Sequence, residues 1–340
     1  MSVVRSFPAR VVRPEWARRL VSGLSELPED TGTLPPVAPV DPASYAEPEV
    51  ALYVYRQGDH TGVVCEVDVR GFVDGRVRGH EAVQAQRVDS LVKHMETDAA
   101  PALVALLHRA GAAYLRTVDD VTAATPLLDF TGPGGLQQLV WRVPPGQATD
   151  TLAAELSAAD HYIADGHHRV AASLAAWERT GEPTGAGVLC VVHPMDGLRL
   201  SAFHRRVLGP VERAELEAVL EPTFTVEPVV AVPVLETGSF GLYTEGHWHV
   251  VAPRSPGDGL DVEVLTRQVL DRLVQNIEIA PARTPVDELT RRCDADGGAL
   301  FTLAPPPLEA LTRLADAGAV MPPKTTYFEP KPCAGIFRRA

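Results

Sequence analysis

One stretch constrains the fold of this chain more than any other. The segment YIADGHHRVAASLAAWERTG, residues 162–181, joins a short apolar run to a long alanine-rich stretch through a single glycine. The apolar run predicts a buried strand, the glycine a turn, and the alanine-rich stretch a helix. This strand, turn and helix are the frame for the chemistry considered below.

The first turn of that helix is basic. A helix N-terminus carries about half a positive charge and several N–H groups without partners, so acidic or small polar residues normally stabilise it. Here Gly166, His167, His168 and Arg169 fill the turn. Asp165 is expected to act as the N-cap, but it offsets only part of this charge.

A bound anion would explain the basic turn. Gly166 would let the backbone approach an anion closely, the N–H groups would donate to it, and Arg169 would hold two of its oxygens. His167 and His168 leave the helix about 100° apart, so we expect one to contact the anion or donate a proton and the other to orient the turn. The alternative is that Asp165 caps the helix, the histidines bond locally and Arg169 reaches solvent.

A second stretch, RVRGHEAVQAQRVDSLVKHME, places His80 and Glu81 in a loop before an amphipathic helix. Arg76, Arg78 and Arg87 surround them in sequence. A carboxylate near cationic groups could serve as a general base. Glu81 could equally be an acidic residue that stabilises the start of the helix.

The remaining elements alternate irregularly, without an internal repeat. We predict a hairpin over 49–69, strands over 135–143, 160–164, 186–193, 198–207, 239–252 and 299–304, and helices over 85–98, 100–111, 148–159, 211–220, 260–275 and 307–319. Residues 20–48 are predicted to be an extended surface segment, and 70–83 a loop rich in glycine and arginine. This order favours an α+β (mixed α/β) fold over a regular doubly wound sheet.

Composition narrows the function classes. The chain of 340 residues has 31 Lys and Arg against 44 Asp and Glu, a net charge of −13, which disfavours nucleic acid or an anionic membrane as partner. No window approaches the roughly 18 apolar residues of a membrane span, and no signal sequence is evident, so we expect a cytoplasmic protein. The four cysteines are far apart and predict buried free thiols.

Other candidate sites are weaker. His247 and His249 share one face of a predicted strand, and His161 precedes the basic turn, but neither has the further ligands of a metal site, so none is predicted. Ser173 lacks the context of a nucleophile. The tail MPPKTTYFEPKP could close over a phosphate or carboxylate through Lys324, but we favour an extended edge with Tyr327 and Phe328 buried.

The motifs together resemble a known family. YIADGHHR, the upstream RGHE, AFHR and the terminal MPPKTTYFEPKPCAGI resemble the family of domain of unknown function 1015 over most of the chain. The D-G-H-H-R element is also similar to that of the ParB/sulfiredoxin superfamily, especially the archaeal free-serine kinases. The resemblance implies a ParB/sulfiredoxin-like phosphate-binding region at 49–208, between an extended segment at 1–48 and an additional C-terminal α+β region at 209–340.

The resemblance also implies roles. Asp165, Gly166, His167, His168 and Arg169 would contact the phosphates of ATP or ADP, with Mg²⁺. Glu81 would be the base that activates a serine hydroxyl.

The leading interpretation is thus a nucleotide-dependent kinase of free L-serine or a similar hydroxy amino acid. His168 is a second catalytic candidate, and Arg78, Arg87 and Lys324 are candidates for binding the substrate carboxylate. The alternative is a ParB-like regulatory protein that binds a nucleotide, or DNA, without kinase activity; sulfiredoxin chemistry is disfavoured because no cysteine lies in the turn. The sequence leaves open whether the C-terminal third contacts substrate or forms a homodimer surface.

Overall fold

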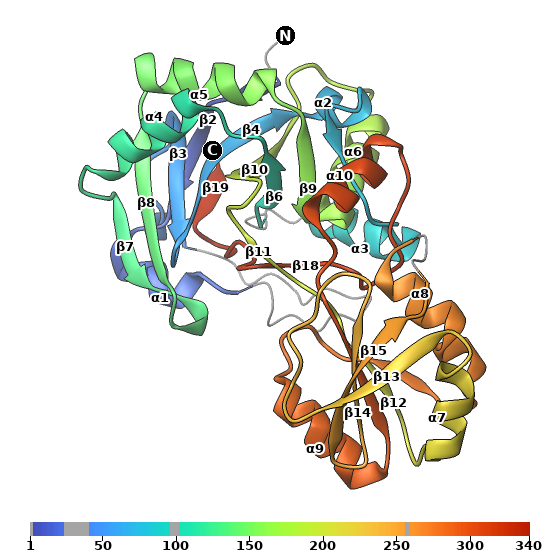
Figure 1. Cartoon of the computed structure of the whole chain (residues 1–340). Helices are drawn as coiled ribbons and strands as arrows, with labels where there is room; N and C mark the ends of the chain where they lie inside the picture. Colours follow the sequence, from blue (N-terminus) through green and yellow to red (C-terminus); the bar gives the residue numbers. More distant parts are fainter. Residues whose placement is uncertain (1–2, 24–40, 96–101, 256–258) are drawn as a thin grey trace. The chain divides into compact units, whose positions relative to one another are not determined.

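Two compact units make up the chain in the computed structural model, which describes residues 3–23, 41–95, 102–255 and 259–340 (Figure 1). Unit 1 comprises residues 1–199, 314–320 and 330–340, and unit 2 comprises 200–313 and 321–329. The chain therefore enters unit 2 before the predicted change at Gly209, and its tail returns to unit 1. Both units combine helices with β-sheet, which confirms the predicted α+β (mixed α/β) class.

A mixed sheet forms the centre of unit 1. In the described residues it has eleven strands, with β19-β2-β3-β4-β10-β6-β9-β5 as its main order and β1, β7 and β8 paired at its side. The strands are β1 Val4–Arg5, β2 Phe7–Val11, β3 Glu49–Gln57, β4 His60–Asp68, β5 Val77–Arg78, β6 Val104–His108, β7 Leu128–Thr131, β8 Gln137–Val143, β9 His161–Asp165, β10 Gly187–Pro194 and β19 Phe337–Arg339.

The predicted hairpin is confirmed as β3 and β4. Gln57 pairs with His60, and Gly58 takes a φ of 59° in the turn between them. Glycine adopts such a φ at less cost than other residues, which favours a turn at this position.

The helix predicted over 100–111 is wrong. Val104–His108 form β6, which lies between β10 and β9 and has all five residues buried. A strand buried on both faces has a continuous apolar run, and such a run does not distinguish strand from helix by period. The sheet position, which depends on distant strands, decided the outcome.

Helices pack on the sheet of unit 1. They are α1 Pro14–Leu20, α2 Val69–Val73, α3 Ala85–Met95, α4 Ala112–Thr122, α5 Gln147–Ala158 and α6 His167–Arg179. Tyr114 of α4, Leu152 of α5 and Val170 of α6 enter the same apolar core as the strands. The predicted helices over 85–98 and 148–159 are confirmed in the described residues, whereas the predicted loop over 70–83 contains most of α2 and all of β5. Much of the extended segment predicted over 20–48 lies outside the described residues.

Unit 2 has a sheet of its own, in the order β13-β15-β14-β17-β12-β16. Its elements are β12 Arg205–Val207, α7 Arg213–Leu220, β13 Phe224–Val229, β14 Phe240–Thr244, β15 His247–Pro253, α8 Asp261–Gln268, β16 Ile277–Ile279, α9 Val286–Asp296 and β17 Ala299–Leu303. A short ladder pairs β11 (Arg199–Ser201) with β18 (Tyr327–Glu329), and α10 spans Leu308–Asp316. Tyr327 and Phe328 are buried, so the extended form predicted for the tail is confirmed.

Candidate active site

The basic turn lies where the sequence predicts it, between β9 and α6. Its cap differs from the prediction: Gly166, not Asp165, is the N-cap residue, with a left-handed φ of 105°. The carboxylate of Asp165 instead pairs with Arg169 and, through its other oxygen, with Lys331 at 3.3 Å. A glycine cap offers no side-chain acceptor, so the first N–H groups of α6 receive none from their cap.

Arg169 folds back over Gly166. A Cβ on Gly166 would lie 3.0 Å from Nη2 and 3.1 Å from Cζ of Arg169, so a larger residue would have to displace the guanidinium. Nη1 of Arg169 donates to the carbonyl oxygen of Leu103, and Nη2 donates to Asp165. Two of the five N–H donors of this guanidinium are therefore engaged within unit 1.

Glu81 meets the buried ring of His167. Nδ1 of His167 lies 3.2 Å from Oε2 of Glu81, and the two side chains are 4% and 42% exposed. The backbone N–H of His80 donates to Nε2 of His167 at 3.3 Å. A ring nitrogen that accepts carries no proton, so His167 is the neutral tautomer that donates from Nδ1 to the carboxylate.

His168 reaches the same loop. Its Nε2 accepts from the backbone N–H of Gln84 at 3.1 Å. Both rings therefore bind the segment 80–84. That one histidine contacts an anion or donates a proton while the other orients the turn stays a prediction. Because the two side chains leave the helix about 100° apart, His167 binds the segment at His80 and His168 binds it at Gln84.

Both carboxylates of the site stay ionised at neutral pH. Burial raises the pKa of Glu81, but the hydrogen bond that His167 donates lowers it, and the resulting pKa lies below its usual value. Burial likewise raises the pKa of Asp165, while Lys331 and Arg169 bring it below its usual value. Burial, with the charge of Arg87, lowers the pKa of His168.

The neighbouring carboxylates offset part of the positive charge of the basic turn. The chain supplies its own anions, since Asp165 pairs with Arg169 and Lys331, and Glu81 pairs with His167. With neutral histidines, two carboxylates face two cations. The charge that remains is the positive end of the α6 dipole, which favours an added anion by about 0.3–1 kcal/mol when exposed.

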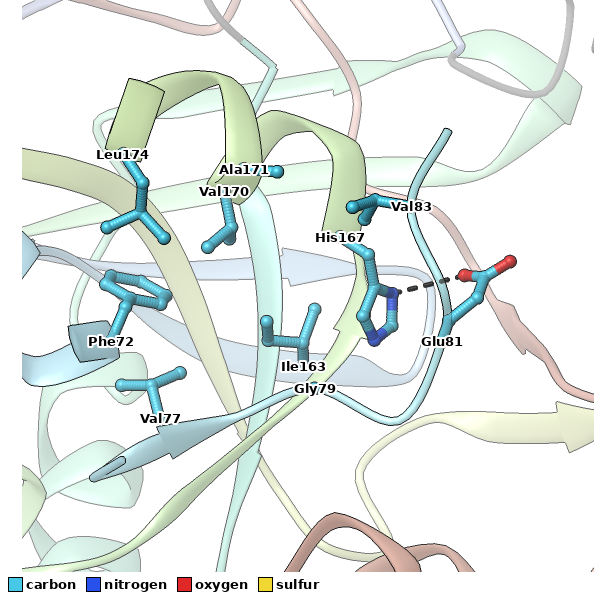
Figure 2. A pocket seen from close by; sticks show the side chains of 10 residues that line it. All are labelled: Phe72, Val77, Gly79, Glu81, Val83, Ile163, His167, Val170, Ala171 and Leu174. Carbon is cyan, nitrogen blue, oxygen red and sulfur yellow. Dashed lines mark ion pairs between the residues drawn. The ribbon is translucent and has the colours of Figure 1, made fainter. Parts of the chain in front are cut away.

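An apolar pocket of about 220 Å³ adjoins the Glu81–His167 pair (Figure 2). Figure 2 shows the ring of His167 between Ile163 and Glu81, with the Glu81 carboxylate directed away from the apolar side chains. Of the lining residues, only Glu81 and His167 were predicted to belong to the site. The residues that line the pocket come from α2, β5, β9, α6 and the loop between β5 and α3: Phe72, Val77, Gly79, Glu81, Val83, Ile163, His167, Val170, Ala171 and Leu174.

Three cations, Arg78, Arg87 and Lys324, were predicted to bind the substrate carboxylate, and their surroundings differ. Arg78 forms salt bridges with Asp160 at 3.1 Å and with Asp316 at 2.9 Å. Arg87 lies in the first turn of α3 and, within the described residues, forms no salt bridge. Lys324 belongs to unit 2, where its Nζ lies 5.3 Å from the ring centre of Phe203.

The other candidate residues, His161, His247 and Ser173, lie in separate surroundings. His161 is buried and stacks on His108 at 5.9 Å, His247 is exposed, and Oγ of Ser173 donates to the carbonyl of Arg169. In the described part of the chain, no group of three or more His, Cys, Asp or Glu residues could hold a metal ion. The four cysteines are free and buried, as predicted.

Sequence reasoning missed Lys331, the backbone of Gln84 and the role of His80. Lys331 lies in the unusual proline-rich tail, which was a visible signal, but no local pattern pointed it toward Asp165. The bonds from His80 and Gln84 join residues 87 and 84 positions apart. Such contacts follow from the pairing of β5 with β9 and from the packing of α3 on α6.

Residues 45–278 match the model of the family described as "Protein of unknown function (DUF1015)". This match covers more than half of the chain, which therefore belongs to that family. A search of curated proteins found no match. None of the helices that the structure describes has the length and apolar character needed to cross a membrane.

Solved structures show weaker similarities. A free serine kinase in complex with AMP is 13% identical, with a TM-score of 0.39, over 83% of this chain and 92% of that one. SbnI with a C-terminal truncation, from Staphylococcus aureus, is 14% identical, with a TM-score of 0.41, over 81% and 87%. A conserved hypothetical protein from Pyrococcus furiosus is 13% identical, with a TM-score of 0.36, over 78% and 90%. TM-scores below 0.5 assign no activity to the present chain.

Proposed function

We propose that this member of the DUF1015 family is a nucleotide-dependent phosphotransferase that acts on the hydroxyl of free L-serine or a similar hydroxy amino acid. One observation carries the proposal: an ionised, half-exposed carboxylate, Glu81, is held by His167 beside the glycine-capped start of α6. A base and an anion-binding helix end are what phosphoryl transfer to an alcohol requires. The D-G-H-H-R element, similar to that of ParB/sulfiredoxin proteins, also supports it.

Glu81 would orient the substrate hydroxyl and accept its proton. The hydroxyl oxygen would then bond to the terminal phosphorus of the nucleotide as the bond from that phosphorus to the leaving oxygen breaks. The lowered pKa of Glu81 keeps the carboxylate ready to accept a hydrogen bond, and positioning supplies most of the catalysis in such reactions.

The start of α6 would hold the phosphates of ATP or ADP. Gly166 exposes backbone N–H groups, and Arg169 keeps further N–H donors on the same turn. Mg²⁺ is commonly held by one or two carboxylates together with the phosphates of a nucleotide. Since the described residues hold no three-ligand cluster, we propose that Mg²⁺ arrives with the nucleotide and is met by Asp165 or Glu81.

A cation would bind the carboxylate of the amino acid. Arg87 is the favoured candidate because Arg78 is engaged by two aspartates. Arg87 also lies near enough to His168 to lower its pKa, which places it beside the loop that carries Glu81.

The test is direct formation of O-phosphoserine. Purified protein is incubated with L-serine, Mg²⁺ and either ATP or ADP, and the product is measured by mass spectrometry. Glu81→Gln should lower the rate about 10²–10⁴-fold, the usual contribution of a general base. Glu178→Gln, an exposed glutamate at the far end of α6, is the matched control.

Two results would contradict the proposal. Wild-type protein that forms no phosphoserine and consumes no nucleotide with either donor is not this enzyme. Equal rates in wild type and Glu81→Gln would remove Glu81 as the base. Nucleotide binding without turnover, together with a salt-dependent shift of duplex DNA, would support a regulatory protein instead.

A further inference from the structure

The segment 80–84 is attached to α6 at both of its ends. At one end, the backbone N–H of His80 donates to Nε2 of His167, and at the other, the backbone N–H of Gln84 donates to Nε2 of His168. Glu81 lies between these two attachments and adds a third, from its carboxylate to Nδ1 of His167 (Figure 2). Two consecutive residues of one helix thus hold the loop that carries the proposed base.

His167 has no ring nitrogen left for a ligand. Its Nδ1 donates to Glu81 and its Nε2 accepts from His80, and the side chain is only 4% exposed. The ring of His80 packs against it edge to face at 4.7 Å, and a Cβ on Gly79 would lie 3.0 Å from its Cδ2. A ring enclosed in this way is suited to holding its neighbours in place.

His168 is bound less completely. Its Nε2 accepts from Gln84, and Arg87, Glu81, His167 and Asp165 are the charged and titratable groups that act on it. Because Nε2 accepts, it bears no proton, and the proton of the neutral ring is on Nδ1. The bond therefore anchors the segment where it leads into α3.

From these contacts we propose that His167 and His168 are positioning residues: together they clasp the segment 80–84 and set the place of the Glu81 carboxylate. This rests on the proposed function and deepens it, because it gives the two histidines to the base and leaves the phosphates to the backbone of the turn and to Arg169. It also explains why the helix begins with two histidines, since one serves each end of the segment.

Amide hydrogen exchange tests the clasp without any activity assay. In His168→Leu, the amide of Gln84 loses its acceptor and should exchange about tenfold faster or more, whereas in His168→Gln the side-chain oxygen can still accept and the amide should stay protected. His167→Leu should likewise release the amide of His80. His247→Leu, an exposed histidine in unit 2, is the control and should change neither amide.

Kinetics separate positioning from phosphate binding. A clasp predicts that His168→Leu lowers kcat about tenfold or more with the KM for nucleotide unchanged, and that His168→Gln loses less. In His167→Asn, the side-chain amide takes the place of Nδ1 and can still donate to Glu81. In His167→Gln, the amide takes the place of Nε2, and the donor to Glu81 is lost. By carboxyl NMR, the pKa of Glu81 should therefore rise more in His167→Gln than in His167→Asn.

The outcomes distinguish the two proposals. Unchanged exchange at Gln84 in His168→Leu would overturn the clasp, and so would a raised nucleotide KM at constant kcat. If wild type forms no phosphoserine but the exchange and pKa changes occur as stated, the clasp stands and the kinase assignment fails. His168→Leu provides the test at a half-buried position even if His167→Leu does not fold.

Discussion

The two units bury different kinds of polar side chain. All the buried histidines of the described residues, His80, His108, His161, His167 and His193, belong to unit 1, whereas the buried arginines, Arg205 and Arg206, belong to unit 2. Burial keeps the histidines His80, His108, His161 and His193 of unit 1 neutral at pH 7. In unit 2, Arg206 pairs with two carboxylates, and Arg205 donates to backbone carbonyl oxygens. The proposed catalytic chemistry lies in the unit with neutral histidines, because a neutral ring can accept a backbone N–H and donate to a carboxylate at once.

This difference gives the units different responses to acid. Burial, with the charges of His108 and Arg76, lowers the pKa of His161 to about 3, and burial lowers that of His108 to about 4. Unfolded histidines take up protons near pH 6.5, whereas these buried rings do not. The free energy of unfolding of unit 1 is therefore highest above pH 6.5 and falls as the pH decreases toward 3.

In unit 2 the corresponding group is a carboxylate. Burial raises the pKa of Asp296, but Arg206 and two backbone N–H groups lower it below its usual value. Its stabilisation is present above the unfolded pKa near 3.8 and is lost only below it. Half-buried His204 and His249 are exceptions in unit 2, because burial and Arg205 lower the pKa of His204 to about 4 and burial lowers that of His249.

The largest expected effect is on the ion pairs of unit 2. Arg206 bonds Glu278 at 2.7 Å and Asp296 at 2.6 Å, and its side chain is 11% exposed. Arg206→Met should destabilise unit 2 by about 3 kcal/mol, because it leaves Asp296 without its cation and Glu278 with only the longer contact to Arg292 at 3.5 Å. Hydrogen exchange measured peptide by peptide should show the loss in unit 2 alone, and equal loss in both units would break the comparison.

The second effect concerns acid stability of unit 1. Both ring nitrogens of His161 are buried without a hydrogen-bond partner among the described residues. His161→Leu should therefore leave stability at pH 7 equal or higher, and should reduce the loss between pH 6.5 and 4 by on the order of 2 kcal/mol. Urea unfolding at the two pH values measures this, and an unchanged pH dependence would show that His161 does not titrate on unfolding.

The third effect isolates the glycine cap. Gly166→Ala places a Cβ at a φ of 105° and against the Arg169 guanidinium, so it should cost about 1–3 kcal/mol and disturb activity. Gly238→Ala, at a φ of 93° with nothing within 4 Å of the added Cβ, is the control for backbone strain alone. Equal losses of stability and activity in the two variants would mean that contact with Arg169 is unimportant.

The smallest effect is expected at Arg78. Its salt bridges join side chains that are 28%, 53% and 49% exposed, and exposed pairs contribute about 0–1 kcal/mol. Arg78→Gln should therefore change the free energy of unfolding by less than about 1 kcal/mol, and the KM for serine should rise less than in Arg87→Gln. A larger rise in KM for Arg78→Gln would reverse the proposed assignment of the substrate cation.

Local patterns predicted much of the fold. The hairpin of β3 and β4, the helices α3, α5 and α7, and the join from β9 to α6 follow from periodicity and from glycine placement. The segment 104–108 was predicted wrongly because a fully buried strand has no polar alternation to reveal it. The burial of Tyr327 and Phe328 was predicted from composition alone.

The sequence by itself determined which groups stand at the site: a glycine at a strand-to-helix turn, two histidines and an arginine after it, and a glutamate before another helix. It did not determine what those groups touch. The partners of His167 and His168 are the Glu81 carboxylate and backbone groups more than 80 positions away, and Lys331 reaches Asp165 from the tail. Neighbouring residues determine the local hydrophobic period and the side chains present, whereas hydrogen-bond partners depend on how distant strands and helices pack. For this reason only the tertiary structure decided the roles of the two histidines.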